Sequence, residues 1–227
     1  MYTLYIGNKN YSSWSLRPWL LMTELQIPFT EQLVAFDDGG SWSKFRSFSP
    51  TGLVPCLYDD DQVVWESLAI TEYLAEKHAA VWPTDPSARA WARSAAAEMH
   101  AGFSALRNEC PMSVGLRIKL HHRSSALQQD LQRLDELWAQ GFNEFKGPFL
   151  TGKAFCAVDA FFAPVAYRVQ TFELDLSAQA KQYVNRLLQL EGMQKWANDA
   201  LLEPYREASH EQEFLALGDI LQDLRHP

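Results

Sequence analysis

The alternation of hydrophobic and polar residues divides the chain into two parts of different character. In the first part, short apolar and aromatic runs predict strands, and helical spacing of apolar positions, as in Leu16, Trp19 and Leu20, predicts helices between them. The predicted order is β-α-β followed by β-β-α. The strands are expected at 2–6, 31–36, 54–59 and 63–66. One helix is expected from Ser15 until the segment 26–29, because Pro28 cannot continue it, and another from Ser67 to about His78.

The second part begins after a proline-bearing stretch, "AAVWPTDPSA" (79–88). Prolines break both helices and strands, so this stretch is the best candidate for a linker. Long helical patterns rich in Ala, Leu and Gln follow it, and they predict helices at 87–109, 123–143, 157–171, 178–190 and 193–201. The chain is therefore expected to form an α/β domain at 1–80, a linker at 81–88 and an all-helical domain at 89–227.

The composition and charge of the chain limit which classes of binding partner are expected. The 227 residues include 20 Lys and Arg against 28 Asp and Glu, for a formal charge of −8, and no long basic run concentrates positive charge. Nucleic acid and anionic membranes are thus not expected as partners. The start "MYTLYIGNKN" lacks a basic segment followed by an apolar one, so a cytoplasmic location is expected. The apolar stretch 154–167 is too short to span a bilayer and is expected to form a buried helix.

Metal and disulfide chemistry are not expected. Cys56, Cys110 and Cys156 are odd in number, lie in apolar surroundings and form no CxxC pair. The histidines show no spacing typical of metal ligands, so no metal is predicted.

Three serines stand before the first predicted helix, in "YSSWSLRPWLL" (11–21). Serine is a preferred helix cap, and Ser15, adjacent to Leu16, is the best candidate for that role. Ser12 and Ser13 lie further upstream, which leaves them free for chemistry.

Two further motifs could bind a small peptide. Val54-Pro55 opens a predicted strand, where the proline indicates either a cis bond in a tight bend or a strand at a sheet edge. Ser67 is placed to cap the next helix. The same helix start could hold a carboxylate, with Glu66 beside it binding an ammonium group, so that the pair would grip an amino-acid head group.

These residues carry a resemblance to a known family. "SPTGLVP" followed by "ESLAITEYL", with the helical second half, resembles the cytosolic glutathione S-transferases over essentially the whole chain. The opening serines, Arg17 and "DDGG" are most similar to the serine-type zeta class. The resemblance implies a thioredoxin-like N-terminal domain with a mixed sheet that binds glutathione, and a helical domain that supplies the pocket for the acceptor substrate. It also implies a homodimer.

The resemblance assigns roles to individual residues. Val54 would pair its backbone with the cysteinyl part of glutathione, and Glu66 and Ser67 would hold the γ-glutamyl end. Ser12 matches the serine whose hydroxyl faces the sulfur, and Ser13 is the alternative. The implied activity is conjugation of glutathione to small electrophiles, with glutathione as co-substrate and no metal. A zeta-like maleylacetoacetate isomerase and a glutathione-binding carrier with little catalysis are the other candidates.

Departures from the zeta pattern qualify this assignment. Trp14 replaces the zeta cysteine, so a mixed disulfide with glutathione cannot form at that position. Thr171 stands where zeta proteins have an arginine before the phenylalanine of "TFELDL", which weighs against the isomerase if that arginine grips a dicarboxylate.

Two assignments concern the helical half. Met99, Phe103 and Arg107 recur at four-residue spacing, which is typical of one face of a helix used for packing or a dimer interface. The family places this helix beside the acceptor, so Phe103 and Arg107 are acceptor-site candidates. "GKAFCAVDAFFAP" resembles the capping box of the family, with Asp159 at the third helical position; Phe155 is the staple residue, and Cys156 is the non-catalytic cap.

Overall fold

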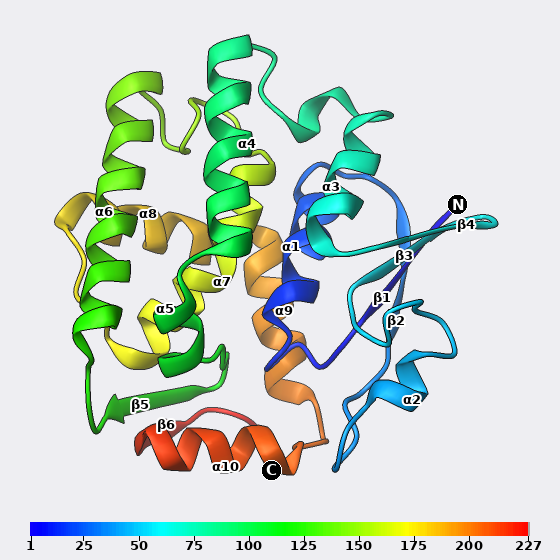
Figure 1. Ribbon diagram of the computed structural model, residues 1–227, viewed down its shortest axis with the longest axis vertical. Coiled ribbons are helices and arrows are strands. Elements are labelled where there is room, and N and C mark those ends of the chain that lie inside the picture. Colours follow the sequence, from blue (N-terminus) through cyan, green and yellow to red (C-terminus); the bar gives the residue numbers. More distant parts are fainter. Residues whose placement is uncertain (227) are drawn as a thin grey trace.

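The computed structural model describes residues 1–226, and its N-terminal part has the expected mixed sheet. This part contains β1 (Tyr2–Ile6), α1 (Ser13–Glu24), β2 (Phe29–Leu33), α2 (Trp42–Phe45), β3 (Cys56–Asp59), β4 (Gln62–Trp65) and α3 (Ser67–Ala75). The strand order is β2-β1-β3-β4, with β1 parallel to β2 and antiparallel to β3, and β3 antiparallel to β4. The predicted thioredoxin-like arrangement is confirmed (Figure 1).

The rest of the chain is mainly helical and lies on the left in Figure 1. A 3₁₀ turn (Ala79–Val81) is followed by the elements α4 (Pro86–Ala101), α5 (Ser104–Glu109), β5 (Leu116–Leu120), α6 (Ser125–Phe145), α7 (Ala157–Phe172), α8 (Ala178–Leu188), α9 (Glu191–Leu202), α10 (Ala208–Leu217) and β6 (Gly218–Asp223). Strands β5 and β6 form an antiparallel pair, which lies between α5 and α10 at the lower left of Figure 1. The helical character is confirmed, but this small sheet and α10 were not predicted, so an all-helical C-terminal part was wrong in that detail.

Several element boundaries differ from the prediction. The first helix starts at Ser13 rather than Ser15, and the second strand is 29–33 rather than 31–36. The helix expected over 87–109 breaks between α4 and α5, where Phe103 adopts a left-handed backbone with φ 53°. Met99, Phe103 and Arg107 therefore do not share one helix face.

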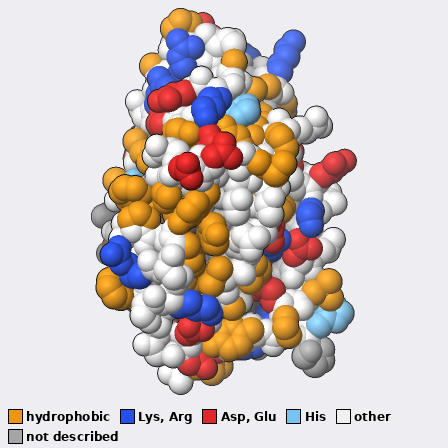
Figure 2. Space-filling view, turned by 90° about the vertical axis from the view of Figure 1, so that its right-hand side faces the viewer, with side chains coloured by type: hydrophobic (Ala, Val, Ile, Leu, Met, Phe, Trp, Pro, Cys, Tyr) orange, Lys and Arg blue, Asp and Glu red, His pale blue; other side chains and the backbone are white. Residues whose placement is uncertain are grey.

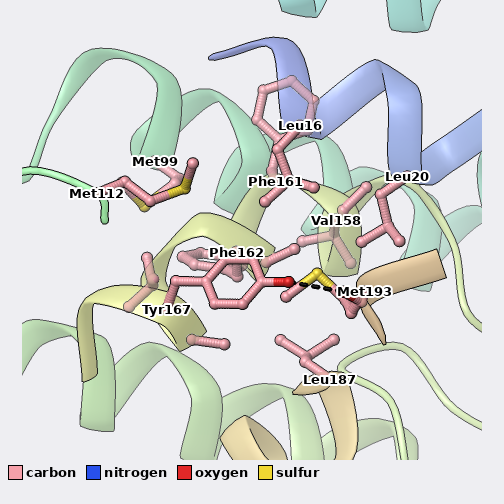
Figure 3. Close-up of a cluster of buried hydrophobic side chains, with 14 of the residues drawn as sticks. Leu16, Leu20, Met99, Met112, Val158, Phe161, Phe162, Tyr167, Leu187 and Met193 are labelled. Carbon is pink, nitrogen blue, oxygen red and sulfur yellow. Dashed lines mark hydrogen bonds between the residues drawn. The ribbon is translucent and has the colours of Figure 1, made fainter. Parts of the chain in front are cut away.

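Helix α7 is the centre of the core. All of its residues except Gln170 are buried, which a run of Ala, Phe and Val permits because no face needs to meet water. Figure 3 shows Leu16 and Leu20 of α1 beside Val158 and Phe161 of α7. In the same cluster the Tyr167 hydroxyl donates to the Met193 carbonyl at 2.7 Å. The two halves of the chain thus share one hydrophobic core.

A buried lysine also links the two halves. Lys9 follows β1, and its ammonium group is 2.9 Å from Glu31 of β2 and 2.7 Å from Asp199 of α9. The same ammonium lies 5.0 Å and 5.4 Å from the ring centroids of Trp19 and Trp196. A buried charge with two carboxylates and two aromatic faces is well compensated, so the loop after β1 is held firmly.

Within residues 1–226 the structure has no helix long and apolar enough to cross a membrane. The three cysteine thiols are free and buried, and burial raises the pKa of Cys56 to about 11 and that of Cys156 to about 12. Buried thiols of raised pKa are poor nucleophiles, in agreement with the structural role expected for Cys156.

Candidate active site

The register of the sheet brings the candidate residues to one edge. Tyr5 of β1 lies opposite Cys56, and Cys56 lies opposite Trp65. The loop after β1 therefore lies beside the residues that precede β3 and those that follow β4. Since β2 runs parallel to β1, the chain after β2 leaves at the same edge. Residues far apart in sequence thus converge there.

A groove of three adjoining cavities occupies this edge. The central cavity, of about 390 Å³, is lined by Ser12, Ser13 and Val54 among others. A second, of about 280 Å³, shares Trp14, Leu53 and Val54 with it and continues to Glu66. A third, of about 570 Å³, shares Phe36, Phe45, Leu53 and His210 with the central one. The structure therefore brings Ser12, Ser13, Val54 and Glu66 to one continuous groove.

Ser12 is the residue that caps α1 by position, in place of Ser15. Its hydroxyl makes no bond to the backbone of the first turn and instead donates to Ser15 Oγ at 2.7 Å. Ser15 lies inside the helix, where its oxygen also accepts from the Gly7 N–H at 3.2 Å. The expected capping role of Ser15 is wrong because the helix begins two residues earlier. The first turn of α1 lacks a side-chain cap and lines the cavity, so its partial positive charge is available to an anion.

Ser13 lies in the same cavity with a different partner. Its oxygen is 3.4 Å from Nη2 of Arg168, which donates to it. This bond is long and leaves the Ser13 hydroxyl proton free. Ser13 can therefore donate to a ligand as it stands, whereas Ser12 must turn its hydroxyl away from Ser15 to do so.

The motif before β3 presents an open backbone. The Val54-Pro55 bond is cis, which settles the two alternatives left by the sequence. Neither the N–H nor the C=O of Val54 has a partner within residues 1–226. Backbone groups at a groove without partners are suited to pairing with an extended ligand.

The start of α3 holds an unsatisfied hydroxyl. Glu66, with φ 74°, occupies the cap position, so Ser67 is the first helical residue rather than the expected cap. Ser67 is completely buried and its Oγ has no hydrogen-bond partner in the part of the chain that the structure describes. Buried polar atoms without partners are rare, and one at a helix N-terminus indicates a place for an anion.

Arg168, which sequence reasoning missed, reaches the site beside Arg107, which was an acceptor-site candidate. Arg168 of α7 and Arg107 of α5 both line the central cavity, and Arg17 of α1 lies behind them, stacked 4.2 Å from the centroid of Trp14. Nε and Nη1 of Arg17 are buried and, within the described residues, have no partner. Burial, followed by the charges of Arg168 and Arg107, holds the pKa of Arg17 well below its usual range. The cluster is thus short of negative charge.

Of the two acceptor-site candidates, Arg107 lines the central cavity and Phe103 does not. Arg107 lines the central cavity, and it also donates to the carbonyls of Met99 and His100 at the end of α4. Phe103 is buried at the break between α4 and α5 and does not line the cavity. A signal for Arg168 was present, because it is the one charged residue after Asp159 in the apolar run that forms α7.

Helix α10 contributes a histidine to the groove. His210 Nδ1 is 2.6 Å from Glu207 Oε2, and the same oxygen accepts the His210 N–H at 2.8 Å. The imidazole stacks on Tyr11, with 4.6 Å between ring centroids. Burial raises the pKa of Glu207, but bonds from Ser209 and His210 outweigh it and lower the pKa to about 2, so this carboxyl is ionised. Nothing in the sequence pattern pointed to this pair.

Comparison with known proteins finds sequence similarity to glutathione S-transferases and to maleylacetoacetate isomerases. Residues 11–77 match the family described as "Glutathione S-transferase, N-terminal domain". A probable maleylacetoacetate isomerase of Caenorhabditis elegans is 29% identical over 181 residues, covering 77% of this chain and 81% of that protein. The maleylacetoacetate isomerase of Rattus norvegicus is 26% identical over 197 residues, covering 84% and 89%.

The fold is found in solved structures as well. A glutathione transferase homologue from Burkholderia, solved with bound glutathione, superimposes with a TM-score of 0.66. It is 24% identical, and the match covers 88% of this chain and 97% of that one.

Proposed function

We propose that this chain is a member of the glutathione S-transferase family, that it binds glutathione in the groove and that it conjugates the glutathione thiolate to small electrophiles. The observation that carries the proposal is the buried, unpartnered hydroxyl of Ser67, directly after Glu66, which lines the groove together with the open backbone of Val54. Ser67 and the start of α3 would bind the γ-glutamyl carboxylate and Glu66 its ammonium group. Val54 would pair with the cysteinyl backbone. The substrate thiol would then lie over Ser12 and Ser13.

The chemistry requires the thiol to ionise. A free thiol has a pKa of roughly 8.5, so only a few per cent is thiolate at neutral pH. A pKa lower by about two units requires about 2.7 kcal/mol of stabilisation of the anion. We propose that the Ser12 hydroxyl turns from Ser15 to donate to the sulfur, and that this bond and the uncapped N-terminus of α1 supply the stabilisation together. Ser13 is the alternative donor.

Calorimetry with glutathione and turnover of an aromatic halide test the proposed function. We expect glutathione binding and a conjugation rate well above the uncatalysed reaction. Absence of glutathione binding would overturn the whole proposal. Binding without turnover of halides, peroxides or maleylacetone would instead favour a carrier protein.

A second candidate, a glutathione-dependent isomerase, is favoured by the arginine cluster. Two relatives that match 77% and 84% of this chain are a probable maleylacetoacetate isomerase and a maleylacetoacetate isomerase. In such a reaction the thiolate adds to a carbon–carbon double bond, the new single bond rotates, and the carbon–sulfur bond breaks to return the thiolate. Negative charge passes to the conjugated carbonyl, where a guanidinium stabilises it. Thr171 has no charge and does not line the central cavity, but Arg168, about one turn earlier on α7, does line it.

Replacing Arg168 by Met separates the two candidates. We expect kcat/KM for maleylacetone to fall about 10- to 100-fold, because a hydrogen bond to a charged group is lost, with less than about threefold change for a neutral aromatic halide. The same two kcat/KM values are measured for Arg107→Met, which removes the other, less buried arginine of the central cavity. Equal losses with both substrates, in a variant whose circular dichroism is unchanged, would contradict a role in binding an anionic acceptor.

We also propose that the protein is a homodimer. The N-terminal domain leaves the large apolar side chain of Trp65, outside the groove, 42% exposed. Figure 2 shows hydrophobic side chains gathered on the face that this domain presents. Such a surface favours association. Light scattering after gel filtration should give about twice the 25.9 kDa of the chain, and a monomer at micromolar concentration would contradict it.

A further inference from the structure

We propose that His210 of α10 binds the glycyl carboxylate of glutathione, so that the C-terminal helix forms part of the glutathione site. This inference rests on the proposed function and assigns the end of the tripeptide that Val54, Glu66 and Ser67 leave unaccounted for.

The direction of the bound peptide follows from the groove. If Glu66 and Ser67 hold the γ-glutamyl end and Val54 the cysteinyl residue, the glycyl end must extend past Val54 away from Glu66. The cavity in that direction is the largest of the three and begins at Leu53. Phe36, Phe45 and His210 are among its lining residues, and Phe36 packs against the His210 ring.

The charges around this cavity leave one candidate for binding an anion. Among its described lining residues, Asp37 and Glu207 are acidic, and His210 is the one that can carry a positive charge. Lys44 lies nearby in sequence but does not line the cavity. Its ammonium group binds Asp37 at 2.8 Å and the Ala35 carbonyl at 2.8 Å. A carboxylate entering here therefore has His210 as its cation.

His210 is also held in a fixed orientation. Glu207 is ionised and can only accept, so His210 Nδ1 is the donor in their 2.6 Å contact. The ring is clamped by Tyr11 at 4.6 Å and Phe36 at 5.3 Å between centroids. Its Nε2 has no protein partner in residues 1–226. In the imidazolium form both nitrogens donate, one to Glu207 and the other to the glycyl carboxylate.

The carboxylates of Glu207 and Glu211 do not prevent His210 from binding the glycyl carboxylate, because both are already paired within the protein. Glu207 accepts bonds from the Ser209 hydroxyl and from both the backbone and the ring of His210. Tyr11 and Arg225 both donate to Glu211 at 2.6 Å, which ties α10 to the loop that carries Ser12. The helix is therefore fixed at the groove by contacts that do not use His210 Nε2.

The test compares glutathione with its monoethyl ester, in which the glycyl carboxylate is blocked. By calorimetry, wild-type protein should bind glutathione about 10-fold or more tightly than the ester, because only the free acid makes the charge-assisted bond. His210→Ala and His210→Gln should weaken glutathione binding about 10-fold and leave ester binding within about twofold. His122→Ala, at an exposed histidine after β5, is the matched control and should bind both ligands like the wild type.

Each outcome decides between the two proposals. Equal affinity of wild-type protein for glutathione and the ester overturns the role of His210, and so does equal weakening of both ligands in the variants. Failure of wild-type protein to bind either ligand overturns the proposed function itself.

Discussion

Replacing Asp159 by Ala is expected to lower the free energy of unfolding by about 3–5 kcal/mol. This carboxyl is completely buried at the start of α7. It accepts from the backbone N–H groups of Leu150 and Cys156, both at 3.1 Å, and from the Tyr183 hydroxyl at 2.8 Å. Alanine leaves three buried donors without an acceptor. Equilibrium unfolding in urea measures the loss.

Two variants control this measurement. Asp159→Asn keeps an acceptor oxygen and should lose less stability than the alanine variant. Asp175→Ala removes a carboxylate that is 88% exposed and should change the free energy of unfolding by less than about 0.5 kcal/mol. A loss below about 1 kcal/mol in Asp159→Ala would show that the capping box of Asp159 and Cys156 does not stabilise the fold.

The same carboxyl makes stability depend on pH. Burial raises the pKa of Asp159 to about 6, against the hydrogen bonds that lower it. The native state therefore holds this proton up to a higher pH than the unfolded chain, whose aspartates titrate near 3.9. The contribution of the group is fully present below about pH 4 and is lost as the pH rises through about 6. The Asp159→Asn variant should lack this component of the pH profile.

Ser12→Ala is expected to lower kcat/KM for an aromatic halide by up to about 100-fold at pH 7, with glutathione affinity changed less than about threefold. The reason is that the variant keeps the peptide contacts at Val54, Glu66 and Ser67 but loses the donor to the thiolate. Ultraviolet absorbance of bound thiolate, followed against pH, should show the pKa of the bound thiol moving up toward its free value.

Ser13→Ala is the matched variant, because both serines line the central cavity. It should retain most of the activity, and the activity of Ser12→Ala should recover at high pH, where the thiol ionises without help. If Ser13→Ala loses turnover and Ser12→Ala does not, the donor is Ser13, whose free hydroxyl proton already permits that role.

The N-terminal site could be predicted because it depends on local signals. Strand periodicity located β1, β3 and β4, and short connections fix which ends of those strands meet. Val54, Glu66 and Ser12 consequently fell at one edge once the strands were placed. The start of α1 was misplaced because three candidate caps within four positions give no local reason to prefer one.

The contributions of the helical half could not be predicted in the same way. Arg17 and Arg168 meet because α1 packs against α7 across the two halves, and periodicity within either helix does not reveal that pairing. His210 reaches the groove because β6 pairs with β5, about a hundred residues earlier in the chain. Strand β6 is exposed along most of its length and shows no apolar alternation, so no local pattern pointed to it.

The buried Lys9 has a consequence for how separable the two halves are. Its partners Glu31 and Asp199 come from different halves, and Glu203 of the second half accepts the Lys9 backbone N–H at 2.6 Å. Residues 1–80 alone would keep the buried ammonium while losing half of its compensating charge, and would expose the α1 surface that covers α7. Neither half therefore holds a complete set of native interactions, and we expect the chain to unfold as one cooperative unit in spite of its two architectures.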